Sequence, residues 1–203
     1  MRLTPVLLLL AAAGVVGCSP ATVPTGDGSV GYDVTAFKDD APANATVEEF
    51  PQAFVDADGR AVDLAAFRGR KVLLFVLRGV PQTTGGAFCP SCLAQVSGVL
   101  AHRTEFDGRG VEVMVLFPGP AGRVGEFVEA ARRQTPGEPA KAFRLLTDPD
   151  LKACSRLGIR ADLAKPSAYV LDTAGRVTYA YVGETSTDRP SIKAVLAQLD
   201  RAK

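Results

Sequence analysis

This chain has few residues that could bind a metal, and its positive and negative charges are almost equal in number. It has one histidine and four cysteines in 203 residues, and its 23 Lys and Arg face 22 Asp and Glu. A structural zinc site needs four ligands, usually in two closely spaced pairs, and only Cys89 and Cys92 form such a pair. Binding to a phosphate backbone requires a clustered positive excess. We therefore expect no nucleic-acid partner, no metal and no other cofactor.

The apolar run near the N-terminus is too short to span a bilayer comfortably. It extends from Val6 to Val16 and ends in small residues, which favours cleavage of a secretion signal over a retained helix. Its end at Gly17 and Cys18 resembles a bacterial lipoprotein signal, in which the final cysteine is lipidated and becomes the new N-terminus. We predict that residues 1–17 are removed. Lipidated Cys18 would then anchor the chain in the bacterial cell envelope, on the outer side of the cytoplasmic membrane or in the outer membrane. The alternatives are ordinary cleavage or an uncleaved anchor, with Cys18 incidental.

A segment poor in large apolar groups follows the predicted signal. Residues 19 to about 45 are rich in Pro, Gly, Ser, Thr, Ala and Asp, so they cannot bury enough surface to fold by themselves. We predict a flexible tether over 18–45. The remaining chain, 46–203, has a length that suits one compact domain, and it shows no internal repeat.

Hydrophobic patterning predicts an α/β domain. Two near-continuous apolar runs, Lys71–Leu77 and Val111–Phe117, are typical of parallel strands that are covered on both faces. Hairpins are predicted at the domain edge over 54–62 and near the C-terminus over 167–182. Helices are predicted over 89–106, 124–131, 150–157 and 188–199, with a short strand over 143–146. This order of elements indicates a central sheet of mixed character flanked by helices.

Two thiols stand three residues apart where the first apolar run leads into a predicted helix. On the first turn of a helix, sulfurs at the spacing of Cys89 and Cys92 can close a disulfide. The unpaired N–H groups and the helix dipole there stabilise a thiolate on Cys89. Pro90 suits this turn because it has no N–H to lose. We predict that Cys89 is the nucleophile and that Cys92 resolves a mixed disulfide formed on it. Half of a zinc site and an inert structural bridge are the other interpretations of the pair.

The region from about Gln52 to Leu199 resembles the thioredoxin-fold redoxins. This group contains the alkyl hydroperoxide reductases, the thiol-specific antioxidant proteins and their exported thiol-disulfide relatives. The resemblance rests on the edge hairpin and on segments 72–77, 88–92, 110–117, 146–150 and 165–172. It implies a thioredoxin-like fold with a central mixed sheet, and a thiol-based redox activity that either exchanges disulfides or reduces peroxides.

The same resemblance implies a substrate-binding position at Lys165 and Pro166. Thioredoxin-fold proteins carry there a cis-proline that faces the dithiol. The carbonyl and N–H of the preceding residue can then bind an extended chain as a short added strand. The alternative is an ordinary trans-proline at the start of an edge strand.

The loop before the dithiol departs from the pattern of the peroxide-reducing relatives. Those relatives place a proline and a threonine at a fixed short spacing before the attacking cysteine, whereas Pro81, Thr83 and Thr84 lie farther from Cys89. They also pack an arginine against that cysteine, and Arg78 is the candidate for this thiolate-stabilising role. A solvated or paired Arg78 is the alternative. The second cysteine of the pair favours exchange with protein disulfides instead.

Two further features bear on the chemistry. Cys154 is either a resolving thiol on a mobile helix, which would capture an oxidised Cys89, or a small apolar core residue. No acidic residue lies within Val72–Leu77, so the proton acceptor that many thioredoxins place behind their second cysteine has no evident counterpart.

These features favour an envelope-anchored thiol-disulfide oxidoreductase that uses Cys89 and Cys92. We expect a protein or small-molecule disulfide as substrate, a reducing redox partner, and membrane attachment through Cys18. The second hypothesis is a thiol peroxidase, in which a peroxide oxidises Cys89 to a sulfenic acid that Cys92 or Cys154 resolves. The third is a non-catalytic metal carrier that uses two thiolates. Copper carriers of this fold have a wider cysteine spacing and a histidine near the cis-proline region, and this chain has neither.

Overall fold

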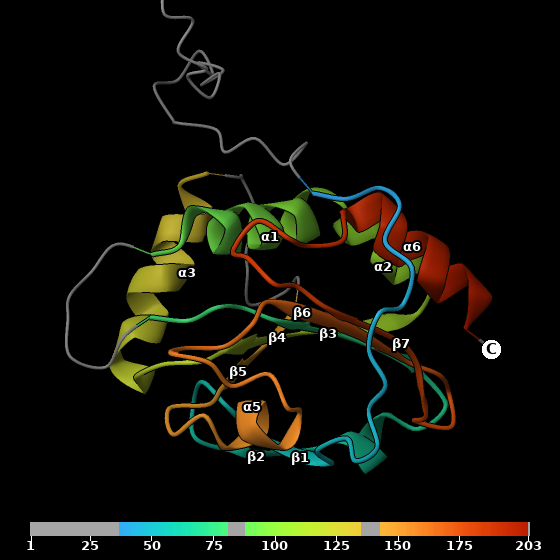
Figure 1. Ribbon diagram of the computed structural model, residues 1–203, viewed down its shortest axis with the longest axis horizontal. Coiled ribbons are helices and arrows are strands. Elements are labelled where there is room, and N and C mark those ends of the chain that lie inside the picture. Colours follow the sequence, from blue (N-terminus) through green and yellow to red (C-terminus); the bar gives the residue numbers. More distant parts are fainter. Residues whose placement is uncertain (1–36, 81–87, 135–142, 203) are drawn as a thin grey trace, which may run out of the picture.

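The computed structural model describes residues 37–80, 88–134 and 143–202. Its strands are β1 Ala53–Asp56, β2 Ala61–Asp63, β3 Lys71–Val76, β4 Val111–Phe117, β5 Arg144–Thr147, β6 Ser167–Leu171 and β7 Val177–Val182. They form a seven-stranded mixed sheet in the order β2-β1-β5-β4-β3-β6-β7 (Figure 1). The α/β class, the mixed sheet and the edge hairpin, formed by β1 and β2, are thereby confirmed.

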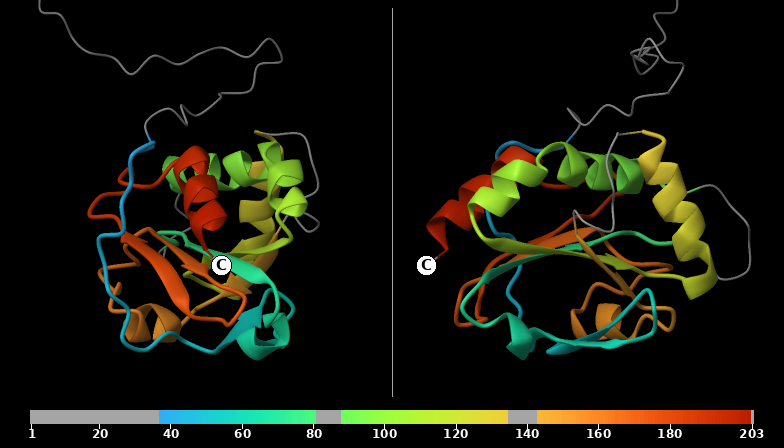
Figure 2. Two further views of the ribbon diagram at one scale, coloured as in Figure 1. Left: turned by 90° about the vertical axis from the view of Figure 1, so that its right-hand side faces the viewer. Right: turned by 180° about the vertical axis from the view of Figure 1, so that it is seen from behind.

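Helices lie on both sides of this sheet. They are α1 Pro90–Ala101, α2 Arg103–Gly108, α3 Val124–Arg132, α5 Lys152–Arg156 and α6 Ile192–Arg201, with 3-10 turns η2 Leu64–Phe67 and η3 Ala121–Arg123. One side carries α1, α2, α3 and α6, while α5, η2 and the β1–β2 hairpin lie toward the other (Figures 1 and 2). The central strands are therefore enclosed from both sides.

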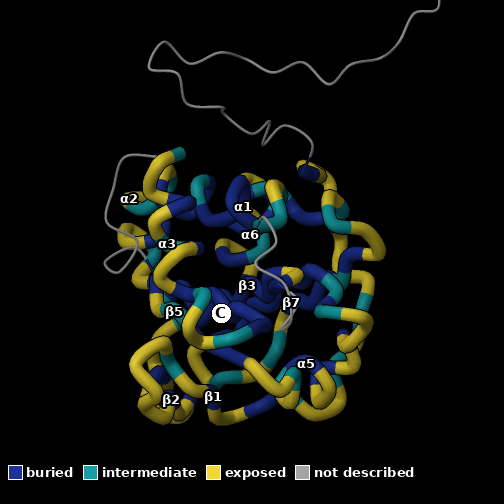
Figure 3. The backbone as a smooth tube through the Cα atoms, turned by 90° about the vertical axis from the view of Figure 1, so that its left-hand side faces the viewer, coloured by how far each residue is buried: buried dark blue, intermediate teal, exposed yellow. Residues whose placement is uncertain are grey.

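This enclosure explains the unbroken apolar run of β3. Leu73 and Phe75 pack into the cluster beneath α1, whereas Leu74 and Val76 pack into the cluster on the α5 side. Every residue from Val72 to Val76 is buried, and Figure 3 shows the buried strands at the centre of the molecule. Strands β3, β4 and β5 pair in parallel, so their carboxyl ends share one edge of the sheet. The chain leaves β3 at this edge and reaches the dithiol.

The dithiol helix and the last helix both differ from their predicted bounds. The predicted dithiol helix is interrupted at His102, whose ring Nδ1 lies 2.9 Å from the carbonyl oxygen of Gly98, and it forms the separate helices α1 and α2. The last helix, predicted to begin at Asp188 or Arg189, begins after Ser191 instead. The Ser191 hydroxyl caps it by accepting a hydrogen bond from the N–H three residues on, at 3.1 Å. Arg189 therefore lies in the loop before α6.

Residues 37–45, here called the strap, belong to the folded domain. The predicted end of the tether at 45 is therefore too late. Phe37 and Ala41 are buried, and the strap passes beside β7, the last strand of the sheet (Figure 1). The N–H of Asn44 donates to the carbonyl of Ala180 at 3.1 Å, and its side-chain oxygen accepts from the N–H of Val182 at 2.8 Å. Small and polar residues can dock in this way because the edge of a sheet offers unpaired backbone groups.

Three predicted features lie outside the described residues. They are the signal over 1–17, Cys18 at its end, and the loop residues Pro81, Thr83 and Thr84. No helix in the described ranges combines the length and the hydropathy that a membrane span requires. The lipid anchor and the location in the cell envelope stay predictions from the sequence.

Candidate active site

The two cysteines of the dithiol lie at the amino-terminal end of α1. Cys89 is the N-cap residue, and its carbonyl oxygen accepts hydrogen bonds from the N–H groups of Cys92 and Leu93 at 3.0 and 3.2 Å. Pro90 takes the first helical position. Both cysteines are free thiols, and Cys89 is partly exposed whereas Cys92 is 2% exposed. The first sulfur is thus accessible, while the second faces the core.

Aromatic packing fixes the chain just before Cys89. The ring centroid of Phe88 lies 5.4 Å from that of Phe127 on α3 and 6.5 Å from that of Phe117 on β4. The guanidinium carbon of Arg123 lies 4.9 Å from the Phe88 ring centroid. These contacts join the start of α1 to the strand and the helix beside it, so the position of Cys89 is set by the core.

The environment of Cys89 favours its thiolate. A hydrogen bond from the Cys92 thiol is the largest cause that lowers the pKa of Cys89 from its ordinary value of 9.0 to about 5. Partial burial opposes this shift, while the N–H groups of Cys92 and Ser91 and the positive charge of Arg189 add to it. Cys89 is therefore ionised at neutral pH, where an ordinary cysteine is mostly protonated.

Cys92 is held in the opposite protonation state. Burial is the largest cause that raises its pKa well above 9.0, and the hydrogen bond to Cys89 and the charge of Cys89 raise it further. Two donors nevertheless point at its sulfur: the N–H of Arg78 at 3.3 Å and Nη2 of Arg189 at 3.2 Å. The site therefore holds a thiolate nucleophile in contact with a protonated thiol.

Arg189 is the charged partner of the dithiol, and no pattern in the sequence indicates this role. The residue is 1% exposed. Its Nε donates to the carbonyl of Ser186 at 2.8 Å, its Nη1 to Oε1 of Gln95 at 3.2 Å, and its Nη2 to Cys92. None of the ion pairs formed among the described residues includes Arg189. A buried cation without a carboxylate is costly, so the dithiol is the group that offsets its charge.

Arg78 contributes to the site through its backbone. Its N–H donates to the Cys92 sulfur, and its carbonyl accepts from the N–H of Ala164 at 3.1 Å. Its side chain is exposed and is not among the groups that lower the pKa of Cys89. The predicted thiolate-stabilising role of Arg78 is therefore corrected: the guanidinium beside the sulfurs belongs to Arg189.

The geometry predicted at Lys165 and Pro166 is wrong. The peptide bond between them is trans, as are all peptide bonds of the described residues. The N–H of Lys165 donates to the carbonyl of Ile159 at 2.8 Å, and its carbonyl accepts from the hydroxyl of Ser167 at 3.0 Å. The turn before β6 therefore uses the N–H of Lys165, which is not free to donate to an incoming chain.

Cys154 lies on the other side of the sheet from the dithiol. It is fully buried in the cluster on the α5 side, whereas Cys89 and Cys92 pack in the cluster beneath α1. Burial is the main cause that raises its pKa, and the carboxylate of Asp148 adds to it. These positions support the interpretation of Cys154 as a core residue, because the sheet separates it from Cys89.

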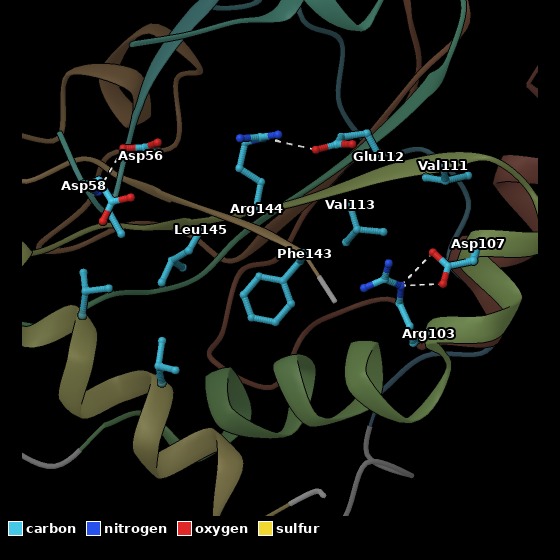
Figure 4. Close-up of a pocket in the computed structure, with 13 residues that line it drawn as sticks. Asp56, Asp58, Arg103, Asp107, Val111, Glu112, Val113, Phe143, Arg144 and Leu145 are labelled. Atoms are coloured by element: carbon cyan, nitrogen blue, oxygen red, sulfur yellow. Dashed lines mark hydrogen bonds and ion pairs between the residues drawn. The ribbon is translucent and has the colours of Figure 1, made fainter. Parts of the chain in front are cut away.

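Two pockets lie near opposite ends of the parallel strands. One, of about 410 Å³, lies at the carboxyl ends of β3 and β4 and is lined by Arg78, Val80, Pro118, Gly119, Pro149, Leu151, Asp162 and Leu163. The other, of about 440 Å³, lies at the amino ends of β4 and β5 (Figure 4). Four of its charged side chains pair within it, Arg103 with Asp107 and Arg144 with Glu112, whereas Asp58 pairs with Arg60 outside the lining. The first pocket includes Arg78, whose N–H contacts the Cys92 sulfur, but neither cysteine is among the residues that line it.

Comparison with known proteins gives a family match over most of the chain. The Redoxin family model matches residues 35–196. The putative peroxiredoxin Bcp of Haemophilus influenzae is 29% identical over 98 residues, which cover 48% of this chain and 54% of that protein. The chain thus spans about half the length of the curated relatives it matches.

Solved structures share the fold at low sequence identity. The peroxidoxin BcpB from Mycobacterium tuberculosis aligns with a TM-score of 0.58 at 21% identity, over 81% of this chain and 99% of that one. A secreted disulfide oxidoreductase of Mycobacterium tuberculosis aligns with a TM-score of 0.52 at 15% identity, over 73% of this chain and 94% of that one. These likenesses confirm the thioredoxin-like fold, and at such identities they carry nothing about activity.

Proposed function

The chain belongs to the Redoxin family, and we propose that it is a thiol-dependent oxidoreductase that cycles between a Cys89 and Cys92 dithiol and the corresponding disulfide. The observation that carries the proposal is the contact between two sulfurs that differ in exposure and in protonation state. A partly exposed Cys89 with a pKa of about 5 contacts a buried Cys92 that stays protonated. A ready nucleophile with an adjacent resolving thiol is the arrangement that disulfide exchange requires.

The first step is attack by Cys89. Its thiolate displaces one sulfur of a substrate disulfide, so a mixed disulfide forms on Cys89 and the other half leaves as a thiolate. Cys89 needs no base for this step, because it is already ionised at neutral pH. The partial exposure of Cys89 gives a substrate disulfide access to its sulfur.

The second step closes the internal disulfide. Cys92 loses its proton, and its sulfur attacks the sulfur of Cys89. The mixed disulfide breaks, and the second substrate thiolate leaves. The substrate has then gained two electrons, and the oxidised dithiol must be reduced by a second dithiol partner before another turnover.

A peroxide is the second candidate oxidant, because the curated relatives that match are named peroxiredoxins. Cys89 would attack the peroxide oxygen, release an alcohol or water, and become a sulfenic acid. Cys92 would then attack that sulfur and release water. Both routes end in the same disulfide between Cys89 and Cys92, so they differ only in the oxidant that reacts with Cys89.

Membrane attachment and metal transport are two further possibilities that the sequence raises. Membrane attachment through lipidated Cys18 would place the dithiol in an oxidising compartment, where a reducing partner is needed. A metal carrier is the weakest alternative: in the described ranges no group of three His, Cys, Asp or Glu is placed to hold a metal ion.

The test compares two oxidants on the fully reduced chain. Loss of alkylatable Cys89 is followed after mixing with a model disulfide or with hydrogen peroxide, and mass spectrometry locates the new bond. We expect the model disulfide to drive a bond between Cys89 and Cys92 faster than peroxide does. Oxidation by peroxide orders of magnitude faster than that of a free thiol would assign the chain to the peroxidases. Retention of full activity in Cys89→Ser would contradict both assignments.

A further inference from the structure

The closing step poses a difficulty that the two cysteines alone do not solve. Cys92 must become a thiolate before it can attack. However, Cys92 is only 2% exposed, and this burial opposes a negative charge on its sulfur. No acidic residue follows it on the first turns of α1, and the strand beneath it carries none. The charge that appears on Cys92 therefore needs a compensating group from elsewhere in the fold.

We propose that Arg189 is a catalytic residue of the closing step, where its buried guanidinium stabilises the thiolate that Cys92 becomes as it attacks Cys89. Nη2 of Arg189 lies 3.2 Å from the Cys92 sulfur before any charge has formed there. A hydrogen bond from a charged donor strengthens when its acceptor ionises, so the interaction grows during the step. This inference rests on the proposed dithiol cycle.

Neighbouring groups leave the charge of Arg189 available to the dithiol. Its other donors meet neutral oxygens, the carbonyl of Ser186 and Oε1 of Gln95. The adjacent carboxylate of Asp188 is occupied by Lys38, at 2.7 Å, and by the hydroxyl of Tyr181, at 2.6 Å. The titratable groups that face Cys92 are thus Cys89 and Arg189, with the N–H of Arg78 as a further donor.

The strap fixes the loop that carries Arg189. The N–H of Lys38 donates to the Arg189 carbonyl at 2.8 Å, and the Lys38 carbonyl accepts from the N–H of Ser191 at 2.8 Å. Gly183 packs against the same loop so closely that a Cβ there would overlap the carbonyl oxygen of Asp188. Backbone contacts on two sides therefore hold Arg189 at the sulfur, as a preorganised catalytic charge requires.

Arg189 neither gains nor loses a proton or a covalent bond during the closing step. The Cys92 proton passes to solvent, and the electron pair of its sulfur forms the bond to Cys89. The bond between Cys89 and the substrate sulfur breaks, and that sulfur leaves with the electron pair. With a sulfenic acid on Cys89, the leaving group is hydroxide, which takes up a proton to become water. Arg189 only offsets the charge on Cys92 between deprotonation and attack.

The test separates the two steps in time. Reduced chain is mixed with a model disulfide and quenched with acid and an alkylating reagent at successive times, and mass spectrometry counts the Cys89 mixed disulfide and the closed disulfide. The variants are Arg189→Lys, which keeps the charge, Arg189→Gln, which removes it, and Gln95→Glu. The last is nearly isosteric and places a carboxylate against the guanidinium. Arg109→Gln is the control, since it removes an arginine from an exposed pair with Asp200.

We expect closing to slow by about 10- to 100-fold in Arg189→Gln and in Gln95→Glu, to change by less in Arg189→Lys, and to stay unchanged in Arg109→Gln. The pH midpoint of the closing rate should move upward in the two slow variants, which a purely structural role would not cause. If Arg189→Gln does not fold, Gln95→Glu decides alone, because it keeps both side-chain shapes. Unchanged closing with an unchanged pH midpoint in either folded variant would overturn the role of Arg189. If neither a mixed disulfide on Cys89 nor a bond between Cys89 and Cys92 forms in the unmodified chain, the proposed function is overturned instead.

Discussion

Nη2 of Arg189 donates a hydrogen bond to the sulfur of Cys92 at 3.2 Å, although the two residues are 97 positions apart in the chain. One belongs to the first turn of α1 and the other to the loop before α6. A buried positive charge thus touches the less accessible sulfur of the pair. Any change in the charge of the dithiol changes the free energy of this contact, and several measurable properties depend on it.

The reactivity of Cys89 should show a low pH midpoint. Because the Cys92 thiol donates to the thiolate and lowers the pKa of Cys89 to about 5, alkylation of Cys89 should be half-maximal near that pH. The rate should then be nearly constant across neutral pH. Alkylation followed by mass spectrometry from pH 4 to 10 measures the profile. Cys92→Ala, which removes the donor, should raise the midpoint toward 9.0, while Cys92→Ser, which keeps a hydroxyl donor, should raise it less.

The charge of Arg189 should also set the redox equilibrium. The reduced site contains a thiolate that Arg189 stabilises, and the disulfide contains none. Arg189 therefore favours the reduced form, so Arg189→Gln should make the reduction potential more negative, by about 30 mV for each tenfold change in the equilibrium constant. Equilibration with glutathione buffers of known ratio measures the shift. A potential that is unchanged or more positive in the variant would contradict this role.

The chain after β3 tolerates no side chain at Gly79. This residue has a φ of +85°, and a Cβ would overlap the carbonyl oxygen of Pro118. We expect Gly79→Ala to lower the free energy of unfolding by roughly 2 to 4 kcal/mol. Gly59→Ala is the matched control: its φ is +81° with no atom within 4 Å of the added Cβ, and it should cost only about 1 kcal/mol. Urea unfolding compares them, and equal losses would argue against the close approach.

The pair between Lys38 and Asp188 should make stability depend on pH. Burial raises the pKa of Asp188, but hydrogen bonds from Lys38 and Tyr181 outweigh it and hold the pKa at about 2. A carboxylate with a lowered pKa in the folded state adds stability above its unfolded pKa of 3.8, and this stability is lost as the pH falls through about 2. Lys38→Met should therefore be less stable than the unmodified chain above pH 4, and the difference should disappear near pH 2.

Urea unfolding across this pH range measures the effect of Lys38→Met. Lys193→Met provides the comparison, because it removes a cation from Asp39 at the exposed surface of the same strap. A difference in stability that stays constant from pH 7 to pH 2 would contradict a role for the ionised Asp188.

Cys154 should have no part in the redox cycle. It lies across the sheet from Cys89, so Cys154→Ala should leave the rate of the closing step unchanged. The loss of a fully buried sulfur should lower the free energy of unfolding by about 1 to 2 kcal/mol. The same quenched time course and urea unfolding measure both effects. A disulfide between Cys89 and Cys154 among the products of the unmodified chain would contradict this assignment.

The parts of the fold that depend on local pattern were predictable from the sequence. The apolar runs of β3 and β4 are covered on both faces, and this burial is what removes polar residues from them. Cys89 and Cys92 were correctly expected at the start of a helix, because Pro90 and the helical spacing after it are local signals. The edge hairpin followed from its turn residues for the same reason.

Contacts made by loops over long distances in sequence were not predictable. Arg189 lies in a segment that the pattern assigned to a helix, and nothing in its neighbours indicates Cys92 as its partner. The strap has the composition of a tether, yet its backbone pairs with the sheet edge and with the loop before α6. Lys165 carries no local sign that the turn before β6 uses both of its backbone groups. Such pairings depend on tertiary structure and leave no periodic signal.

The most direct test of the dithiol cycle is peptide mass spectrometry of the reduced chain after exposure to less than one equivalent of a disulfide oxidant. We expect a bond between Cys89 and Cys92 as the main product, with Cys154 recovered as a free thiol. Cys92→Ser should stop at a mixed disulfide on Cys89. The dithiol cycle would be contradicted if Cys89 stayed reduced while the oxidant was consumed, or if its oxidised product never passed to Cys92.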